Sequence, residues 1–283
     1  MIVSAYAKIN WALHVTGRRP NGYHELDMLM QTVSLCDTLE LEPSEDLSLC
    51  CDRSDVPCGE TNLILRAARA LQQAAGCGKG ARIRLTKRIP SQAGLGGGSS
   101  DCAAALRALN RLWALHLPDE ALLEIGLRLG ADVPFCLTGG LCRAQGVGER
   151  LTPLPGPCAR RRLLLVKPPE GLNTPEVFGA FDRLPPPPPA DIDAAARALA
   201  AGDDALLSRS AANMLTGAAV SLCPAVGQTL DALRDLGASF CAMSGSGSAC
   251  VALFAGDRLP EEGTLHRALG KSSFWRAQTL PPA

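Results

Sequence analysis

The chain reads Pro90-Ser-Gln-Ala-Gly-Leu-Gly-Gly-Gly-Ser-Ser-Asp101 near the end of its first third. Four glycines in five positions allow backbone conformations that other residues avoid, so the backbone can come close to a ligand. Residues 81–89, just before it, alternate apolar and basic side chains, which predicts a strand. Residues 103–113, just after it, are rich in Ala and Leu and predict a helix with one apolar face. The side chains expected in the core are Ile83, Leu85, Ile89, Leu106, Leu109 and Trp113.

The order of strand, glycine-rich loop and helix favours phosphate binding. We expect Ser99-Ser100-Asp101 at the N-cap, so that free backbone N–H groups and the positive end of the helix dipole point into the loop. A merely flexible connection is the alternative, but a linker is not usually held between a clear strand and an Ala-rich helix. The loop is neither a Walker P-loop, which needs a lysine before its serine, nor a good dinucleotide fingerprint, which needs an acidic residue after a second strand. Positive charge for a phosphate must come from elsewhere in the chain.

Size and charge narrow the range of partners. The 283 residues suffice for one large or two medium domains with real cores. Lys plus Arg and Asp plus Glu number 28 each, so no nucleic-acid or anionic-membrane partner is expected and a small molecule is favoured. The N-terminus lacks signal-peptide features and no stretch reaches the ~20 apolar residues of a membrane span, which predicts a cytoplasmic protein. Twelve cysteines without paired spacing and four scattered histidines give no reason to expect a structural metal.

The remaining chain alternates predicted strands and helices, which suits an α+β sandwich. Strict alternation predicts a half-buried opening strand with Ile9, Trp11, Leu13 and Val15 on one face and Lys8 and Asn10 on the other. Pro and Gly around 153–157 predict a boundary between domains 1–155 and 156–283, and Pro185 to Pro189 predict an exposed spacer loop. Further strands are expected at 28–41, 162–167, 240–243 and 250–255, and helices at 61–75, 119–129, 192–200, 205–219 and 226–236.

Three further segments carry residues typical of binding or catalysis. Lys8 on the opening strand can neutralise developing charge beside a phosphate, although a solvated surface lysine is the alternative. Asp132, in Gly130-Ala-Asp-Val-Pro-Phe135, can act on a substrate or merely cap a helix. The Gly/Ser loop at 243–249 can be an ordinary hairpin turn or a second wall over the same phosphates.

Taken in order, these segments resemble the GHMP kinase family. That family has an N-terminal lysine-bearing motif, a central Pro-x-x-x-Gly-Leu-Gly loop followed by serine, and a C-terminal Gly-[Ser/Thr]-Gly loop, and this chain has all three. Within the family, the resemblance is to the members that phosphorylate 4-diphosphocytidyl-2-C-methyl-D-erythritol in the non-mevalonate isoprenoid pathway. It spans residues 4–255 and rests on Ala7-Lys-Ile-Asn10, Asn21-Gly-Tyr-His24, Asn62-Leu-Ile64, Gly94 to Ser100, Gly130-Ala-Asp-Val-Pro134 and Ser244-Gly-Ser-Gly247.

The resemblance implies a fold and a reaction. The fold would be the two-domain GHMP kinase fold, with an N-terminal domain like domain 2 of ribosomal protein S5 and a C-terminal ferredoxin-like α/β sandwich. The reaction would be phosphorylation of the 2-hydroxyl of 4-diphosphocytidyl-2-C-methyl-D-erythritol, with ATP and Mg²⁺ as cofactors, by a monomer or weak homodimer. One alternative is another small alcohol, such as mevalonate or homoserine. The other is a sensor without catalysis, which would be expected to lose Lys8 or Asp132, and both are present.

The resemblance also implies roles at the ATP end of the site. Asp132 would be the general base that takes the proton of the substrate hydroxyl, and Lys8 would stabilise the alkoxide and orient the base. Asn62 and Leu63 would lie near the adenine. Ser99 or Ser100 would lie near Mg²⁺, for which no protein carboxylate ligand can be named. The phosphates would be wrapped by Pro90, Ser91, Gln92, Ala93, Gly94, Leu95, Gly96, Gly97, Gly98, Ser99 and Ser100, with Gly245, Ser246 and Gly247 as the C-terminal loop.

At the substrate end, the resemblance implies an aromatic site for the cytosine ring. Tyr23 and Phe178 would sandwich the ring, and His24 would form a hydrogen bond with its edge. Only 4% of the residues are Phe, Trp or Tyr, so finding two of them at the positions that match the family's motif supports this role. Asn10 and Thr174 would hold the methylerythritol or diphosphate part.

Overall fold

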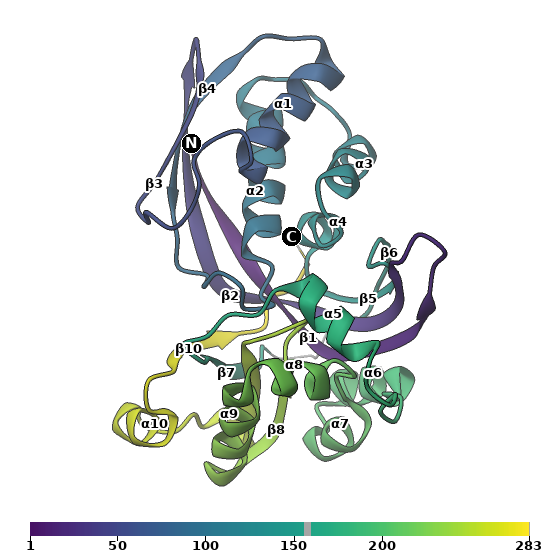
Figure 1. Cartoon of the computed structure of the whole chain (residues 1–283). Helices are drawn as coiled ribbons and strands as arrows, with labels where there is room; N and C mark the ends of the chain where they lie inside the picture. The colour runs from purple at the N-terminus through teal and green to yellow at the C-terminus, as the bar shows by residue number, and fades with distance from the viewer. Residues whose placement is uncertain (156–159, 283) are drawn as a thin grey trace.

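Two β-sheets with helices packed on them make up the fold (Figure 1). The structure is a computed structural model and describes residues 1–155 and 160–282. The expected α+β class is confirmed. The strands are β1 (Ile2–Arg18), β2 (His24–Ser44), β3 (Leu47–Cys51), β4 (Gly80–Thr86), β5 (Leu141–Gly146), β6 (Arg150–Pro153), β7 (Arg162–Lys167), β8 (Ala238–Met243), β9 (Cys250–Phe254) and β10 (Ser273–Gln278). The helices are α1 (Leu63–Ala75), α2 (Gly97–Leu112), α3 (Asp119–Leu129), α4 (Val133–Thr138), α5 (Thr174–Phe181), α6 (Ile192–Ala201), α7 (Asp204–Ser210), α8 (Thr216–Leu222), α9 (Pro224–Asp235) and α10 (Glu262–Leu269), with a 3₁₀ turn η1 (Ala255–Asp257).

The first sheet is organised around the long strand β2. Its N-terminal half pairs with β5 and its C-terminal half pairs with β4, while β1 pairs antiparallel along its other edge. Helices α1 to α4 pack on this sheet and bury an apolar core with strand residues such as Leu41 and Ile83. All six core side chains predicted around the glycine-rich loop are buried.

The second sheet has the order β10-β7-β9-β8 and is antiparallel throughout. Leu163 and Leu165 of β7 face one apolar core, which includes α6 and α7, and Leu164 and Val166 face another, which includes α8 and α9. Alternate side chains of a strand point to opposite faces, so a sheet covered on both faces needs apolar residues at every position. This explains the unbroken apolar run in β7.

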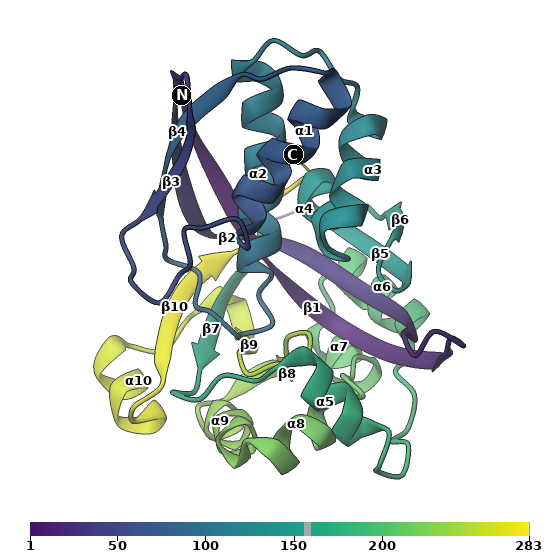
Figure 2. The ribbon, with the colours of Figure 1, turned by 45° about the horizontal axis from the view of Figure 1, so that its top comes forward.

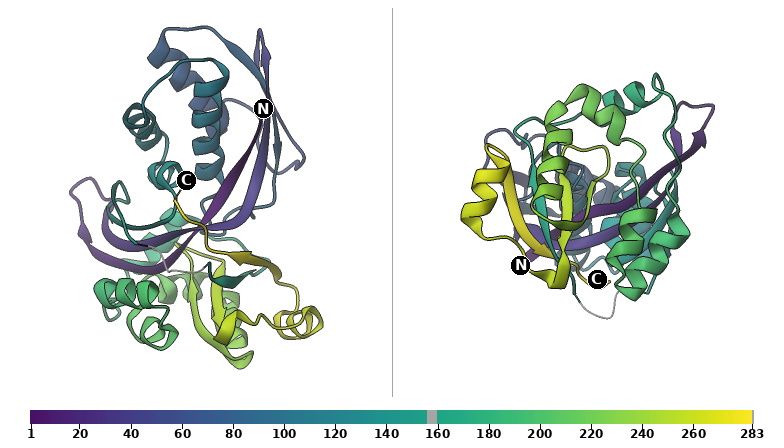
Figure 3. Two further views of the ribbon diagram at one scale, coloured as in Figure 1. Left: turned by 180° about the vertical axis from the view of Figure 1, so that it is seen from behind. Right: turned by 90° about the horizontal axis from the view of Figure 1, so that it is seen from below.

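Strand β1 passes between the two halves of the molecule, as the view from behind shows (Figure 3). It contributes Ala5 to the core under α1 to α4, Trp11 to the core shared with α6, and Leu13 to the core shared with α8. The predicted half-buried strand with strict alternation is therefore wrong. Residues 7–13 are buried on both faces, and an irregularity between Asn10 and Ala12 turns Leu13 to the side of Lys8 and Asn10.

Two predicted helices have different limits in the structure. Helix α2 begins at Gly97 with Gly96 as its N-cap, so Ser99-Ser100-Asp101 lie inside the helix and do not cap it. The predicted helix at 205–219 is divided into α7 and α8. It is interrupted because residues 212 and 214 form backbone hydrogen bonds with Leu13 of β1. By contrast, α1 closely matches the helix predicted at 61–75. Asn62 caps its start by accepting a hydrogen bond from the Ile64 N–H, and Gly76 ends it with φ of 61°.

The chain between β6 and β7 includes the predicted domain boundary. That boundary, between residues 155 and 156, adjoins residues 156–159, which lie outside the described range. The predicted Pro185 to Pro189 spacer is irregular in structure and mostly exposed. Among the described residues, no helix is long and apolar enough to cross a membrane.

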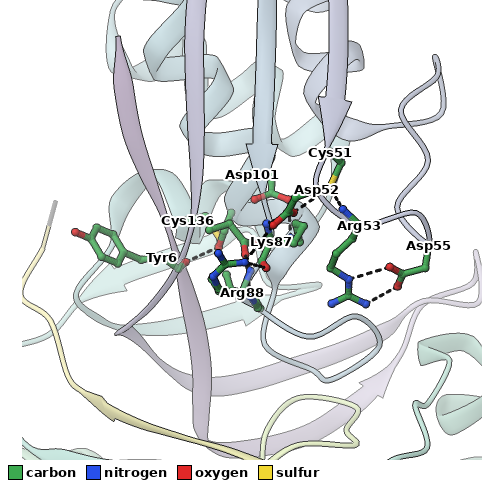
Figure 4. Close-up of polar contacts among 12 residues, drawn as sticks. Tyr6, Cys51, Asp52, Arg53, Asp55, Lys87, Arg88, Asp101 and Cys136 are labelled. Atoms are coloured by element: carbon green, nitrogen blue, oxygen red, sulfur yellow. Dashed lines mark hydrogen bonds and ion pairs between the residues drawn. The ribbon is translucent and has the colours of Figure 1, made fainter.

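A buried ion cluster lies beneath the start of α2. The Lys87 ammonium contacts the Asp37 carboxylate. It also lies 2.8 Å from the Asp101 carboxylate, and Figure 4 labels these two residues. Asp37 also accepts the backbone N–H groups of Arg88 and Ile89, whereas Asp101 Oδ1 has no hydrogen-bond partner among the described residues. Two carboxylates thus share one buried cation. Burial raises the pKa of Asp101 to about 7, and Lys87 opposes the shift.

This pKa predicts how Asp101 affects stability with pH. Between its ordinary value of 3.8 and about 7, the folded chain keeps a proton on Asp101 that the unfolded chain has lost, so stability falls as pH rises through that range. Asp101→Asn removes the excess charge and keeps an oxygen for Lys87. The variant does not share the loss of stability that wild type undergoes as the pH rises. We therefore expect the difference in melting temperature, variant minus wild type, to increase by about 2–4 °C between pH 5 and pH 8.

The control for this measurement is Asp55→Asn. Asp55 is exposed and its pKa is lowered by a hydrogen bond from Arg53, so its effect on stability is already complete at pH 5 and stays constant to pH 8. Melting curves by circular dichroism at the two pH values check both variants. An equal change for Asp101→Asn at both pH values would contradict the raised pKa.

Candidate active site

The predicted site residues gather around one cleft with a volume of about 1080 Å³. Its walls come from both halves of the molecule: β1 and β2, the loop before α2, the loop before α4, α5, and the loop between β8 and β9. The predicted residues that line it are Lys8, Asn10, Tyr23, His24, Asn62, Leu63, Pro90, Ser91, Gln92, Ala93, Gly94, Leu95, Gly96, Gly97, Gly98, Ser99, Asp132, Thr174, Phe178, Gly245 and Ser246.

The glycine-rich loop leaves the N-terminus of α2 open to the cleft. Gly96 is the N-cap, with φ of 70°, and has no side chain to bond the first N–H groups of the helix. These groups have no partner within a helix, and the helix dipole makes this end positive. The start of α2 is therefore suited to an anion such as a phosphate.

Lys8 and Asp132 lie together on the floor of the cleft. The Lys8 ammonium is 3.4 Å from Asp132 Oδ2 and donates a hydrogen bond of 2.9 Å to Asn10 Oδ1. The Lys8 side chain is 6% exposed and that of Asp132 is 32% exposed, so the lysine is held in place while the carboxylate stays accessible. Asp132 occupies the N-cap position of α4, but its side chain makes no capping hydrogen bond. The alternatives of a solvated lysine and a capping aspartate do not describe this geometry.

The second Gly/Ser loop lies directly against the first. Ser244 Oγ accepts a hydrogen bond from the Asn10 N–H at 3.2 Å and donates one to the Gly94 carbonyl at 3.0 Å. The Asn213 side-chain amide donates to the carbonyls of Met243 and Gly245 and so holds this loop from behind. Figure 2 shows the loop before α2 reaching toward the loop between β8 and β9. The loop at 243–249 is thus part of the cleft wall.

Thr174 and the two residues predicted to lie near the adenine, Asn62 and Leu63, also reach the cleft. The Thr174 hydroxyl lies 2.7 Å from the Ser246 hydroxyl, which joins α5 to the second loop. Asn62 and Leu63 lie at the start of α1, and Val56 and Pro57 line the same end of the cleft. This end is a mixed apolar and amide surface of the kind that suits a flat heterocycle.

The predicted pyrimidine end differs in detail from a simple sandwich. The His24 ring stacks on Phe178 with ring centroids 4.6 Å apart and planes at 22°, so one face of Phe178 is already covered. Tyr23 also lines the cleft but is 64% exposed. His24 Nε2 lies 2.7 Å from Asp182 Oδ1. A base between Tyr23 and Phe178 would have to lie on the uncovered face of Phe178, or on His24 itself.

Two predicted residues do not line the cleft. Ser100 is buried and donates its hydroxyl hydrogen bond to the Tyr6 carbonyl, so it is not available to a metal, and Ser99 is the serine that faces the cleft. A Cβ at Gly247 would meet Met243 and Leu172, which places this glycine against the core.

Sequence reasoning also missed three positions that shape the site. Ser244 stood inside a quoted motif but had no assigned role, whereas Asn213 and Asp182 act on partners far along the chain and carry no local signal.

Gly94 gives a direct test of the contact between the two loops. It has φ of 70°, and a Cβ there would lie 2.1 Å from the Ser244 carbonyl oxygen, so Gly94→Ala must separate the loops. We expect the KM for ATP to rise at least about tenfold and the melting temperature to fall by several degrees.

Gly217→Ala is the matched control for Gly94→Ala. Gly217 lies in α8, and nothing is within 4 Å of a Cβ built there. The control is expected to leave both quantities near wild type. Unchanged ATP kinetics in Gly94→Ala would show that close contact of the loops is not required.

Comparisons with known proteins agree with this geometry. The family model for the GHMP kinases N terminal domain matches residues 62–140, and that for GHMP kinases C terminal matches residues 195–270. The 4-diphosphocytidyl-2-C-methyl-D-erythritol kinase of Pelotomaculum thermopropionicum is 44% identical over 259 residues, covering 90% of each chain. That of Paramagnetospirillum magneticum is 42% identical over 285 residues, covering 97% of this chain and 96% of its own.

Solved structures give the same result. A crystal structure of 4-(cytidine 5'-diphospho)-2C-methyl-D-erythritol kinase is 38% identical, with a TM-score of 0.81 and 99% of each chain covered. The homoserine kinase of Cytophaga hutchinsonii matches at 20% identity with a TM-score of 0.71, over 99% of this chain and 95% of that one, which shows the shared fold alone. The family resemblance predicted from the motifs is confirmed. The chain therefore belongs to the GHMP kinase family, among the 4-diphosphocytidyl-2-C-methyl-D-erythritol kinases.

Proposed function

We propose that this chain transfers the γ-phosphoryl group of ATP to the 2-hydroxyl of 4-diphosphocytidyl-2-C-methyl-D-erythritol. The observation that supports this most directly is the pair of Lys8 and Asp132, 3.4 Å apart, on the floor of the cleft. One end of this cleft holds the open N-terminus of α2, and the other holds His24 and Phe178. A donor phosphate and a pyrimidine-bearing alcohol can therefore bind on either side of one base and one cation.

The surroundings of the two residues support a separate role for each. Asp132 is the accessible member, so its carboxylate can accept the proton of the substrate hydroxyl as that oxygen attacks the γ-phosphorus. Lys8 has three N–H donors and, in the described part of the chain, two partners, Asn10 and Asp132. The third donor is free to stabilise charge on the transferred phosphoryl group or the alkoxide. Asn10 fixes the lysine because its own backbone is held by Ser244.

The residues of the cleft fit a nucleotide-bound Mg²⁺. Ser99 faces the cleft from the first turn of α2. Its hydroxyl lies close to Gly130, two residues before Asp132, since a Cβ built on Gly130 would be 3.8 Å from Ser99 Oγ. Mg²⁺ prefers oxygen ligands and keeps several waters, so the ATP phosphates, Ser99 and water would hold it. When bound, the ion neutralises charge on the phosphates that leave and transfer.

The acceptor would lie between the hairpin of β1 and β2 and helix α5. Tyr23, His24 and Phe178 supply the aromatic surface for cytosine, and Thr174 and Asn10 line the same cleft as Asp132. Thr174 and Asn10 would contact the diphosphate or the methylerythritol part. Homoserine and mevalonate carry no base and would leave this aromatic end of the cleft unfilled.

A substrate panel tests the proposed function. Purified protein with ATP and Mg²⁺ is assayed against 4-diphosphocytidyl-2-C-methyl-D-erythritol, mevalonate and homoserine, with ADP release as the readout. We expect kcat/KM to be at least about 10³-fold higher for the cytidine compound, because the other two cannot make the contacts at the aromatic end. Preference for mevalonate or homoserine would overturn the proposal.

Asp132→Asn tests the role of the base. General acid–base groups contribute roughly 10²–10⁴-fold, so we expect kcat to fall about 10³-fold while the Kd for a non-hydrolysable ATP analogue changes less than about twofold. Asp119→Asn, at an exposed position on α3, is the control and should match wild type. Equal loss of turnover and of nucleotide binding would make Asp132 a structural residue.

A further inference from the structure

Asp182 connects two segments that are far apart in sequence. It follows the last turn of α5, and its carboxylate accepts hydrogen bonds from His24 Nε2 at 2.7 Å and faces Arg18 Nη1 at 3.2 Å. Arg18 and His24 lie at the two ends of the turn between β1 and β2. One carboxylate therefore fastens this hairpin to the helix that carries Phe178.

The same contacts fix the plane and the rotation of the His24 ring. Phe178 stacks on one face, and the edge of the ring meets Phe181 at 81° with centroids 6.2 Å apart. The His24 side chain is only 9% exposed. With Nε2 held by Asp182, the ring has one orientation, and Nδ1 has no hydrogen-bond partner in the part of the chain that the structure describes.

This arrangement determines which ring nitrogen carries the proton. A nitrogen 2.7 Å from a carboxylate oxygen acts as the donor, so Nε2 bears the hydrogen. The other carboxylate oxygen of Asp182 lies 3.2 Å from Arg18 Nη1. Nδ1 of the neutral ring is then an acceptor.

We propose that Asp182 is a positioning residue that sets base specificity, by holding His24 so that Nδ1 offers a lone pair to the pyrimidine. The inference rests on the proposed function and deepens it. Cytosine carries an exocyclic amino group that can donate to Nδ1, whereas uracil has a carbonyl oxygen at the same place, which would face a second acceptor. Because a bound base would cover Nδ1, the site rejects an analogue that leaves this acceptor without a donor.

The test compares cytidine and uridine ligands in three proteins. Kd values for CDP and UDP are measured by calorimetry, and kcat and KM for the cytidine substrate and its uridine analogue are measured in parallel. Wild type is expected to prefer the cytidine ligand roughly ten- to hundredfold. In Asp182→Asn the preference should fall below about threefold, through KM for the acceptor, with KM for ATP unchanged, and Asp182→Glu should restore part of it.

Two further measurements test the proposal even if Asp182→Asn folds poorly. Nitrogen NMR of histidine-labelled wild-type protein should show His24 with the proton on Nε2, assigned by the loss of its signals in His24→Gln. Asp193→Asn, which breaks an exposed ion pair with Arg143 outside the cleft, is the control and should keep the wild-type preference. A proton on Nδ1 in wild type would overturn the proposal, as would an equal loss of affinity for both bases in Asp182→Asn.

The proposed function and this inference can fail separately. If wild type binds CDP more tightly than UDP but phosphorylates neither substrate, the proposed function is wrong and the role of Asp182 stands. If wild type phosphorylates the cytidine substrate and Asp182→Asn keeps the full preference for it, the role of Asp182 is wrong and the function stands.

Discussion

The site depends on close contact between three segments: strand β1, the loop before α2 and the loop between β8 and β9. The Lys8 N–H donates to the Leu95 carbonyl, the Ala249 N–H donates to the Ala93 carbonyl, and the Ser244 hydroxyl joins Asn10 to Gly94. Two positions leave no room for a side chain: a Cβ at Gly94 would lie 2.1 Å from the Ser244 carbonyl oxygen, and one at Gly96 would lie 2.8 Å from Lys8 Cγ. Glycine here serves the assembly of the cleft as much as it serves a ligand.

Burial of two lysines follows from this assembly. Lys8 and Lys87 lie on either side of the loop that leads into α2, and each is held by polar partners from other segments. A buried cation without such partners would lose several kcal/mol of hydration with nothing to offset it. The carboxylates therefore come with the lysines, and the open end of α2 lies between two fixed charged groups.

Much of the fold could be predicted because its signals are local. The glycine-rich loop between a strand and a helix, the helix at 61–75 and the strand at 162–167 each depend on neighbours in sequence, and each was predicted correctly in kind. The strand irregularity at Asn10 and the break between α7 and α8 could not be predicted, because both arise where β1 pairs with residues 212–214. The same holds for the site. Lys8, Asp132 and the two loops could be predicted because they stood in motifs, whereas the contacts of Ser244, Asn213 and Asp182 join residues that are far apart in sequence.

Strand β1 belongs to all three apolar cores, and this bears on how the chain reaches its native state. β1 is translated well before the segments that it packs against, since Trp11 packs on Phe240 and Asn10 bonds to Ser244, 234 positions later. Contacts of such long range form slowly, because the intervening chain must first be closed into a loop. Translation of most of the chain must precede completion of the cleft, so a nascent or truncated product has an exposed apolar strand that chaperones can bind.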